Sequence, residues 1–295
     1  MRRILFVCFA LIMTIGATFG FAHDGEHEPT LIVYSTVSDL LAGDVSMGAT
    51  IPEMNEELEA FLPDWAVVGV GTTTQVERNG ELMPEGTADA VHYWWVDPSS
   101  ESMSAVVDLA GVGALREEMA MATPIAGATA EASGVNVDFE PEFPFIGLAV
   151  ADPEEALTFE MTDVENLHDW IVATLAETDI TVAGLQVTGD FGAVSTTVGY
   201  NLPPEGIDTS QGTYMSSEHF HFIDYAEPAA WMMQGFYVTD PELDGVVTAV
   251  GAKVHLHGFQ PEALLGGHIA SAIVEHATLT VYPLENVIQL RESDE

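Results

Sequence analysis

Cysteine and basic residues are almost missing from this 295-residue chain. Cys8 is the single cysteine, and 6 Lys+Arg stand against 47 Asp+Glu, so the formal net charge is −41 at pH 7. One cysteine excludes a disulfide framework and a cysteine-rich metal site. The charge also argues against a nucleic-acid partner, because phosphate binding requires positively charged residues. We therefore expect no nucleic acid among the partners.

The acidic residues are scattered along the chain, and 47% of all residues are hydrophobic. This composition predicts a folded protein with an acidic surface, since a disordered acidic tail would lack the apolar residues that form a core. The near absence of lysine indicates a saline external medium, in which dissolved salt screens the repulsion between the carboxylates.

Long apolar runs are also scarce, and the first one lies at the N-terminus. Arg2 and Arg3 precede an apolar run over residues 4–15, and small residues follow up to Ala22. This order is typical of a secretory signal peptide, so we assign residues 1–22 to the signal and expect cleavage after Ala22. The protein is then secreted or periplasmic, with no membrane attachment after cleavage. A retained N-terminal anchor is the competing interpretation, although the run is short for a bilayer span.

The rest of the chain predicts many strands and few helices. Extended segments are indicated at residues 31–34, 66–74, 90–96, 143–150, 180–187, 194–200, 219–224, 231–238, 249–256 and 277–282. We predict an α+β (α/β) fold that is two-domain and strand-rich, with mixed and antiparallel sheets and covering helices. The expected division is an N-terminal sheet domain over 23–160, with an inserted segment at about 99–141, and a C-terminal domain over 161–295.

Two local signals refine this outline. Asn79-Gly80 and Glu85-Gly86 indicate a turn between the strands at 66–74 and 90–96. Thr162 and Glu165 have the spacing of a capping box, which predicts a helix beginning there with an apolar stripe that includes Leu167. His168 within this helix is interpreted as a surface or packing residue.

Three histidines form the strongest functional signal. Residues i and i+2 of a strand point to the same face, so His255 and His257 would project side by side. The ten residues before His268 suffice for a turn at Pro261-Glu262 and a return strand, and Gly266-Gly267 permits a close backbone approach. Three imidazoles with an open position are typical of a catalytic divalent metal, usually zinc. We predict Zn²⁺ or another divalent metal in this C-terminal metal-binding domain.

Other motifs in the sequence say less about function. His219-Phe220-His221 is a second histidine pair with strand spacing, and it is interpreted either as a metal contact or as part of a half-buried strand. The sequence contains no Gly-rich phosphate loop and no Gly-x-Ser-x-Gly elbow. Nucleotide-binding and serine-hydrolase functions therefore have no support.

The histidine hairpin resembles that of a known family. His255-Leu-His257 with Gly266-Gly-His268 is similar to the metal hairpin of α-acetolactate decarboxylases. Upstream segments resemble the same family and occur in the same order along the chain. They span residues 34–44, 69–72, 79–82, 143–146 and 234–240.

The resemblance implies a two-domain protein, often a homodimer, in which the three histidines hold zinc. It implies that Glu81 reaches the metal from the N-terminal half as a ligand or a proton carrier. A second carboxylate near the C-terminus is also implied, for which Glu285 or Glu292 could serve. The implied reaction is decarboxylation of 2-acetolactate, a small anionic 2-hydroxy-3-oxo acid, to acetoin.

One departure from the family concerns an arginine. The family carries it in a strand that matches residues 194–198 here, and this chain has no arginine there. Lys253, the only lysine, lies two residues before His255 and would share its face in a regular strand. We expect Lys253 to take over part of the arginine's role toward the substrate carboxylate, with Arg78 as a rival cation.

Two other functions remain open at this point. Small regulatory domains of a related fold carry the same type of hairpin, so a metal-binding module without decarboxylase activity is one alternative. Another zinc enzyme on the same scaffold, such as a hydrolase that uses metal hydroxide, is the second. The N-terminal resemblance, including Glu81, favours the decarboxylase.

Overall fold

The computed structural model describes residues 27–44, 48–75, 78–100, 103–108, 143–199, 220–262 and 265–290. The predicted signal over 1–22, His219 and Glu292 lie outside the described residues, as does most of the inserted segment at about 99–141. None of the helices in the described ranges has the length and hydropathy needed to cross a bilayer.

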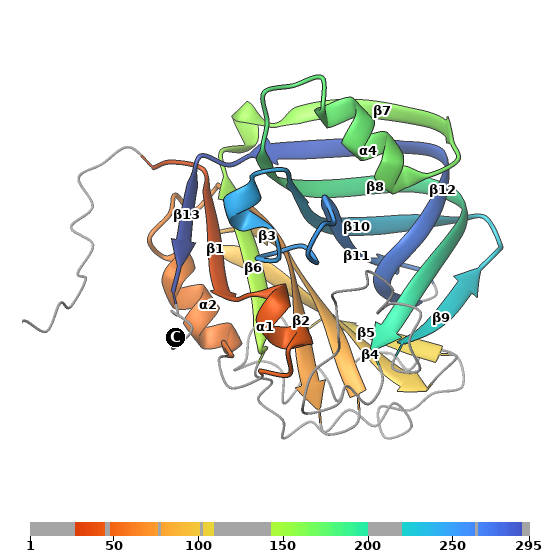
Figure 1. Ribbon diagram of the computed structural model, residues 1–295, viewed down its shortest axis with the longest axis horizontal. Helices are drawn as coiled ribbons and strands as arrows, with labels where there is room; N and C mark the ends of the chain where they lie inside the picture. Colours follow the sequence, from red (N-terminus) through yellow and green to blue (C-terminus); the bar gives the residue numbers. More distant parts are fainter. Residues whose placement is uncertain are drawn as a thin grey trace, which may run out of the picture.

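The first sheet has seven strands (Figure 1). In spatial order they are β13 (Asn286–Gln289), β1 (Thr30–Ser35), β6 (Phe145–Ala151), β2 (Ala66–Gln75), β3 (Arg78–Thr87), β4 (Ala90–Ser100) and β5 (Met103–Asp108). β13 runs parallel to β1 and every other pairing is antiparallel, so the sheet is mixed. The strands expected at 31–34, 66–74, 90–96 and 143–150 are confirmed.

The second sheet has six strands, all antiparallel. They are β7 (Leu157–Val164), β12 (Leu265–Pro283), β11 (Val254–Gln260), β10 (Ala229–Val238), β8 (Val182–Gly199) and β9 (Phe220–Tyr225). β12 pairs with β11 and also with β8, so these strands curl toward one another. Register irregularities let β12 bend sharply, as Figure 1 shows. The strands predicted at 180–187 and 194–200 are one continuous strand, β8.

Short helices cover the sheets. α1 (Val37–Leu41) and α2 (Ile51–Leu58) each begin with a capping box, formed by Thr36 with Asp39 and by Thr50 with Glu53. α4 (Leu167–Leu175) lies over the second sheet (Figure 1) and buries one apolar face against it. Single 3₁₀ turns, η1 (Pro153–Glu155) and η3 (Pro241–Leu243), complete the described helical segments.

Two local predictions are wrong. Thr162 does not begin a helix, because it lies in β7 and pairs with His276 of β12. Strand pairing overrides the capping-box spacing, and the N-cap of α4 is Asn166, whose side chain accepts a hydrogen bond from the backbone N–H of Asp169. The residues of Asn79-Gly80 and Glu85-Gly86 are likewise paired within β3, and the turn falls at Ala88 and Asp89.

The two sheets share a hydrophobic core. Val68 and Ala149 of the first sheet belong to one buried cluster with Val182 and Phe236 of the second. Gly184 permits this contact, because a Cβ placed there would lie 2.6 Å from Ala149 Cβ. The sheets are therefore in direct contact, and residues from both can form one site. The division into two domains at residue 160 stays a prediction.

Polar contacts also link the sheets. Gln234 of β10 donates a hydrogen bond from Nε2 to Glu85 Oε2 of β3 at 2.9 Å, and its Oε1 accepts one from the Gly69 N–H of β2 at 3.4 Å. Gln234 is 1% exposed, so both hydrogen bonds compensate for burial of its amide. This link holds β3 beside β10 and β11.

Replacing Gly235 by alanine is expected to destabilise the protein by about 1–3 kcal/mol, the usual effect of overpacking. Gly235 lies opposite Leu256, and a Cβ there would overlap the His255 carbonyl oxygen. Gly192→Ala is the matched control, because its Cβ would meet only the Glu275 side chain at 3.4 Å or more. Urea unfolding of both variants measures the difference, and equal stabilities would contradict the packing described.

Candidate metal centre

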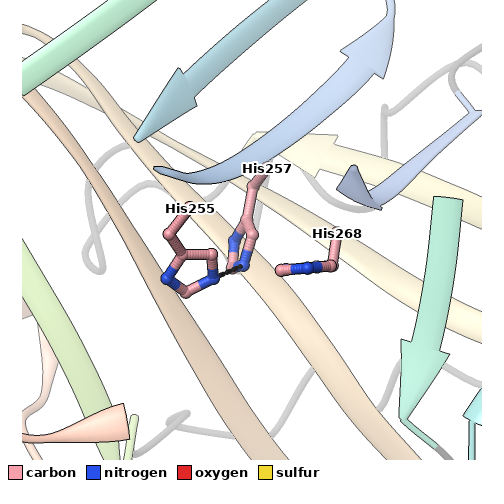
Figure 2. Close-up of side chains that lie close together, drawn as sticks. All are labelled: His255, His257 and His268. Carbon is pink, nitrogen blue, oxygen red and sulfur yellow. Dashed lines mark hydrogen bonds between the residues drawn. The ribbon is translucent and has the colours of Figure 1, made fainter. Parts of the chain in front are cut away.

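The β11–β12 hairpin brings three imidazoles together. His255 and His257 lie on β11, and His268 of β12 is the direct cross-strand partner of His257. One ligand nitrogen from each ring lies within 4.8 Å of the other two. Figure 2 shows the three rings converging on a common space. The structure thus places the three predicted ligands as a group that could hold a metal ion.

Backbone carbonyls orient two of these rings. His255 Nδ1 lies 2.7 Å from the Val247 carbonyl oxygen, and His257 Nδ1 lies 3.1 Å from the Leu82 carbonyl oxygen. A carbonyl oxygen only accepts hydrogen bonds, so each Nδ1 carries the proton and donates it. The Nε2 atoms of the neutral rings then present lone pairs, which is how metal-binding histidines are commonly oriented.

The distance between the two Nε2 atoms supports a cation at this position. His255 Nε2 and His257 Nε2 lie 3.1 Å apart. With both Nδ1 atoms protonated, neither Nε2 has a hydrogen to share, so the facing lone pairs repel each other. A divalent metal that accepts both lone pairs would remove this repulsion, and the donor set suits one.

Glu81 joins the histidines from the other sheet. Its Oε2 on β3 lies 3.2 Å from His257 Nε2 and accepts a hydrogen bond from the Thr72 hydroxyl at 3.0 Å. Burial raises the pKa of Glu81 to about 8, while the Thr72 hydrogen bond acts in the opposite direction. In the absence of a cation, this carboxyl group therefore holds a proton at neutral pH.

Burial has the opposite effect on the histidines. It lowers the pKa of His255 to about 4, and the hydrogen bond to Val247 only partly offsets this effect. The pKa values of His257 and His268 are also lowered well below the usual value, first by burial and then by the neighbouring imidazoles. The rings are therefore neutral near pH 7, which is the form that binds metals.

The centre opens into a cavity of about 390 Å³ between the two sheets. Its polar end is formed by the three histidines, Glu81 and Thr72, while most of the remaining wall is apolar. The rest of the lining comes from α1, the second residue of α4, β-strands of both sheets and the loop before β11, namely Val37, Leu40, Leu41, Phe145, His168, Thr197, Phe220, Phe222, Ala249, Ala252, Val254, Ile269 and Ala270.

Lys253 and Glu285, the other predicted site residues whose side chains the structure describes, do not line this cavity. Lys253 is exposed and lies directly before β11. Glu285 lies beside Pro29, to whose carbonyl its N–H donates. The side chains of Arg78 and His221 lie outside the part described. Among the lining residues that the structure describes, none is arginine or lysine.

Sequence reasoning missed one residue of the cavity. His168 was assigned to the surface or to packing, and the structure places it in the cavity wall with the three histidines. It is the second residue of α4, between the buried Leu167 and the exposed Asp169. No spacing rule links it to His255, since the two are brought together only when α4 packs on the sheet.

A buried centre of three histidines and one carboxylate, at the polar end of an apolar cavity, defines a candidate metal site of the open, catalytic type. No family model and no curated protein sequence matches the chain. Solved structures do match it. α-Acetolactate decarboxylase from Bacillus subtilis strain 168 is similar with a TM-score of 0.58 and 16% identity, over 88% of each chain.

Two further structures give the same result. Acetolactate decarboxylase from Bacillus subtilis subspecies spizizenii matches with a TM-score of 0.58 and 15% identity, over 88% of each chain. A protein of unknown function similar to α-acetolactate decarboxylase, from Staphylococcus aureus, matches with a TM-score of 0.57 and 14% identity, also over 88% of each chain. The fold is therefore that of the α-acetolactate decarboxylases, and the predicted strand-rich class with mixed and antiparallel sheets is confirmed. Activity has to be argued from the site.

Metal affinity is expected to persist in mild acid. Protons compete with a metal for imidazole nitrogens, and exposed histidines take up protons below about pH 6.5. Because the folded site lowers the pKa of His255 to about 4, and those of His257 and His268 as well, the rings stay neutral to lower pH. We expect the Zn²⁺ affinity of the Glu81→Gln protein to change by less than about threefold between pH 7.5 and 6.

Competition titration with a chelator measures this affinity. The wild-type protein is measured in parallel and should lose more affinity, because Glu81 would release its own proton on meeting a cation. A tenfold loss of affinity in the Glu81→Gln protein over this pH range would show that the histidines are protonated more easily than their burial implies.

Proposed function

We propose that the protein is a divalent-metal-dependent carboxy-lyase that converts 2-acetolactate to acetoin, with zinc as the metal. The observation that carries this proposal is the meeting of Glu81 with three histidines across the two sheets, at 3.2 Å from His257 Nε2. The fold shared with α-acetolactate decarboxylases supports the same function.

The cavity suits a small branched oxo acid. 2-Acetolactate has two methyl groups, and its ketone and hydroxyl oxygens sit on adjacent carbons. The apolar wall that includes Val37, Leu40 and Ile269 suits the methyl groups, and the polar end suits the two oxygens.

His255, His257 and His268 would hold the metal. When bound, a divalent metal supplies a Lewis acid that stabilises negative charge on the ketone oxygen. Departure of carbon dioxide leaves its bonding electron pair on the carbinol carbon, and this pair delocalises onto the ketone oxygen as an enediolate. The carbonyl groups of Val247 and Leu82 keep the His255 and His257 rings in the required orientation throughout.

Glu81 is suited to complete the reaction with a proton. The enediolate becomes acetoin when the carbinol carbon takes up one proton. The raised pKa of Glu81, about 8, indicates that its carboxyl group is protonated at neutral pH when no cation is bound. Thr72 donates a hydrogen bond to Oε2 and so fixes the orientation of the acid. A positioned acid of this kind typically contributes a factor of about 10²–10⁴ in rate.

The same observations weigh against one of the alternatives. A module that only binds metal would not require the first sheet to supply Glu81 and Thr72 to the site. Decarboxylation uses each of these features.

The direct test is acetoin formation. Purified protein loaded with Zn²⁺ is incubated with racemic 2-acetolactate, and acetoin is measured against a protein-free control that gives the spontaneous rate. We expect acetoin at a rate well above that control. Hydrolysis of an activated ester without acetoin formation would support the hydrolase instead, and metal binding with neither reaction would support the binding module.

A further inference from the structure

His168 is the fourth imidazole of the cavity, and the reaction described above does not use it. It lines the same cavity as the three histidines but is not one of the group whose ligand atoms lie within 4.8 Å. It is close enough to His255 and His268 for its charge to lower the pKa of both. His168 therefore lies beside the metal centre rather than within it.

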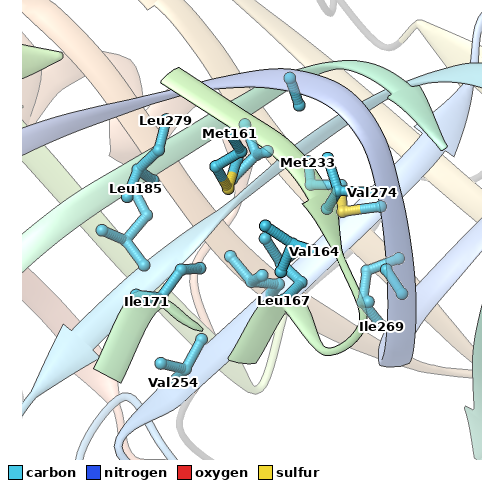
Figure 3. Close-up of a cluster of buried hydrophobic side chains, with 14 of the residues drawn as sticks. Met161, Val164, Leu167, Ile171, Leu185, Met233, Val254, Ile269, Val274 and Leu279 are labelled. Carbon is cyan, nitrogen blue, oxygen red and sulfur yellow. The ribbon is translucent and has the colours of Figure 1, made fainter. Parts of the chain in front are cut away.

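Helix α4 holds this side chain in place. Leu167, Ile171 and Leu175 are fully buried, and they pack with Val254 of β11 and Ile269 of β12, as Figure 3 shows for most of them. Val254 and Ile269 line the cavity as well, so the wall beside His168 is fixed by the hydrophobic core. The Asn166 cap secures the first turn of the helix, to which His168 belongs.

The polar groups of the cavity divide into two sets. The three histidines and Glu81 form the metal centre, and Thr72 donates its hydroxyl hydrogen to Glu81. Among the other lining residues described, His168 and Thr197 carry polar side chains, and no lysine or arginine is present. Within the described part of the chain, no group is found hydrogen-bonded to the His168 ring, so its N–H is available to a ligand.

An anionic substrate in this cavity needs a donor for its carboxylate. We propose that His168 is a substrate-binding residue whose ring N–H donates a hydrogen bond to the substrate carboxylate. This assignment rests on the proposed function for the identity of the substrate, while the recognised chemistry is that of a small 2-hydroxy carboxylate in general.

A neutral donor suits a decarboxylation. Burial lowers the pKa of His168, with Asp169 acting in the opposite direction, so the ring is a neutral N–H donor near pH 7. A guanidinium would hold the carboxylate more strongly as a bidentate ion pair. The charge leaves that carboxylate as carbon dioxide forms, so a strong ion pair would favour the bound substrate over the transition state. A neutral His168 N–H would orient the carboxylate while favouring the bound substrate over the transition state less than an ion pair does.

The kinetic test uses metal-loaded protein and two variants. His168→Phe keeps a flat ring and removes the donor, and we expect KM for 2-acetolactate to rise about ten- to a hundredfold, the usual effect of losing one hydrogen bond to a charged group. His168→Asn restores an N–H donor and is expected to recover part of the affinity. His276→Asn changes an exposed histidine of β12 and should behave as wild type.

A binding test separates this proposal from the proposed function. Calorimetry compares 2-hydroxyisobutyrate, which has a carboxylate, with butane-2,3-diol, which has none. We expect His168→Phe to lose at least about tenfold in affinity for the carboxylate and less than about twofold for the diol. This comparison holds even if the wild-type protein forms no acetoin, an outcome that would reject the decarboxylase alone.

Three results would overturn the proposal. The first is loss of bound Zn²⁺ in His168→Phe, which would make His168 a metal ligand. The second is unchanged KM and unchanged affinity for 2-hydroxyisobutyrate in that variant. The third is an equal loss of affinity for the acid and the diol, which would indicate a general change in cavity shape.

Discussion

Replacing His257 by alanine is expected to remove bound metal and activity together. His257 is 1% exposed, pairs directly with His268 across the hairpin, and places Nε2 within 3.2 Å of both His255 Nε2 and Glu81 Oε2. It is thus the central group of the site. Loss of one of three imidazole ligands should weaken Zn²⁺ binding by about two orders of magnitude or more.

Metal content after dialysis measures this effect, with elemental analysis of the wild-type and variant proteins side by side. His276→Ala is the matched control, because His276 lies on the same hairpin strand but is exposed. Full metal content in the His257→Ala protein would remove this histidine from the ligand set.

Glu81→Gln is expected to lower turnover about a hundredfold or more while the fold and the metal are retained. The amide has the same shape and its oxygen can still accept the Thr72 hydroxyl hydrogen, but it cannot give up a proton as the carboxyl does. Burial raises the pKa of Glu81 to about 8 when no cation is bound, so its carboxyl group can take up and give up a proton near neutral pH, and that capacity is lost in the variant.

The turnover of the wild-type and Glu81→Gln proteins is compared by the rate of acetoin formation at saturating 2-acetolactate. Circular dichroism checks that the variant is folded. Glu160→Gln is the control, since Glu160 is an exposed acid of β7 that accepts a hydrogen bond from Thr278. Turnover within a few-fold of wild type in Glu81→Gln would exclude Glu81 from proton transfer.

The hairpin was predictable because its geometry is local. Strand alternation places His255 beside His257, and a turn at Pro261-Glu262 with a short return strand sets His268 opposite them. The same reasoning placed Lys253 on the face of His255, whereas the structure leaves Lys253 exposed, directly before β11 and outside the cavity lining.

Glu81 could not be found from spacing. It meets His257 because β3 and β11 are brought together by contacts between the sheets, such as the Gln234–Glu85 hydrogen bond. Resemblance to a family identified Glu81, and the structure places it beside His257 as that resemblance implies. No comparable motif marked His168, whose position depends on the packing of α4.

Strand pairing explains the local errors as well. The Thr162 and Glu165 spacing is a valid capping pattern, yet pairing of Thr162 with His276 in β12 decides the outcome. Asn79-Gly80 favours a turn in isolation, but these residues pair with Thr73 and Thr74 in the β2–β3 ladder. Both errors show long-range hydrogen bonding prevailing over local preference.

The most direct measurement is a titration of activity with metal. Protein stripped with a chelator receives increasing Zn²⁺, and acetoin formation from 2-acetolactate is followed at each addition. The proposed site predicts a linear rise that ends at about one equivalent per chain, because a single group of three histidines forms the site. Acetoin formation that is independent of added metal, or absent at one equivalent, would contradict a metal-dependent decarboxylase.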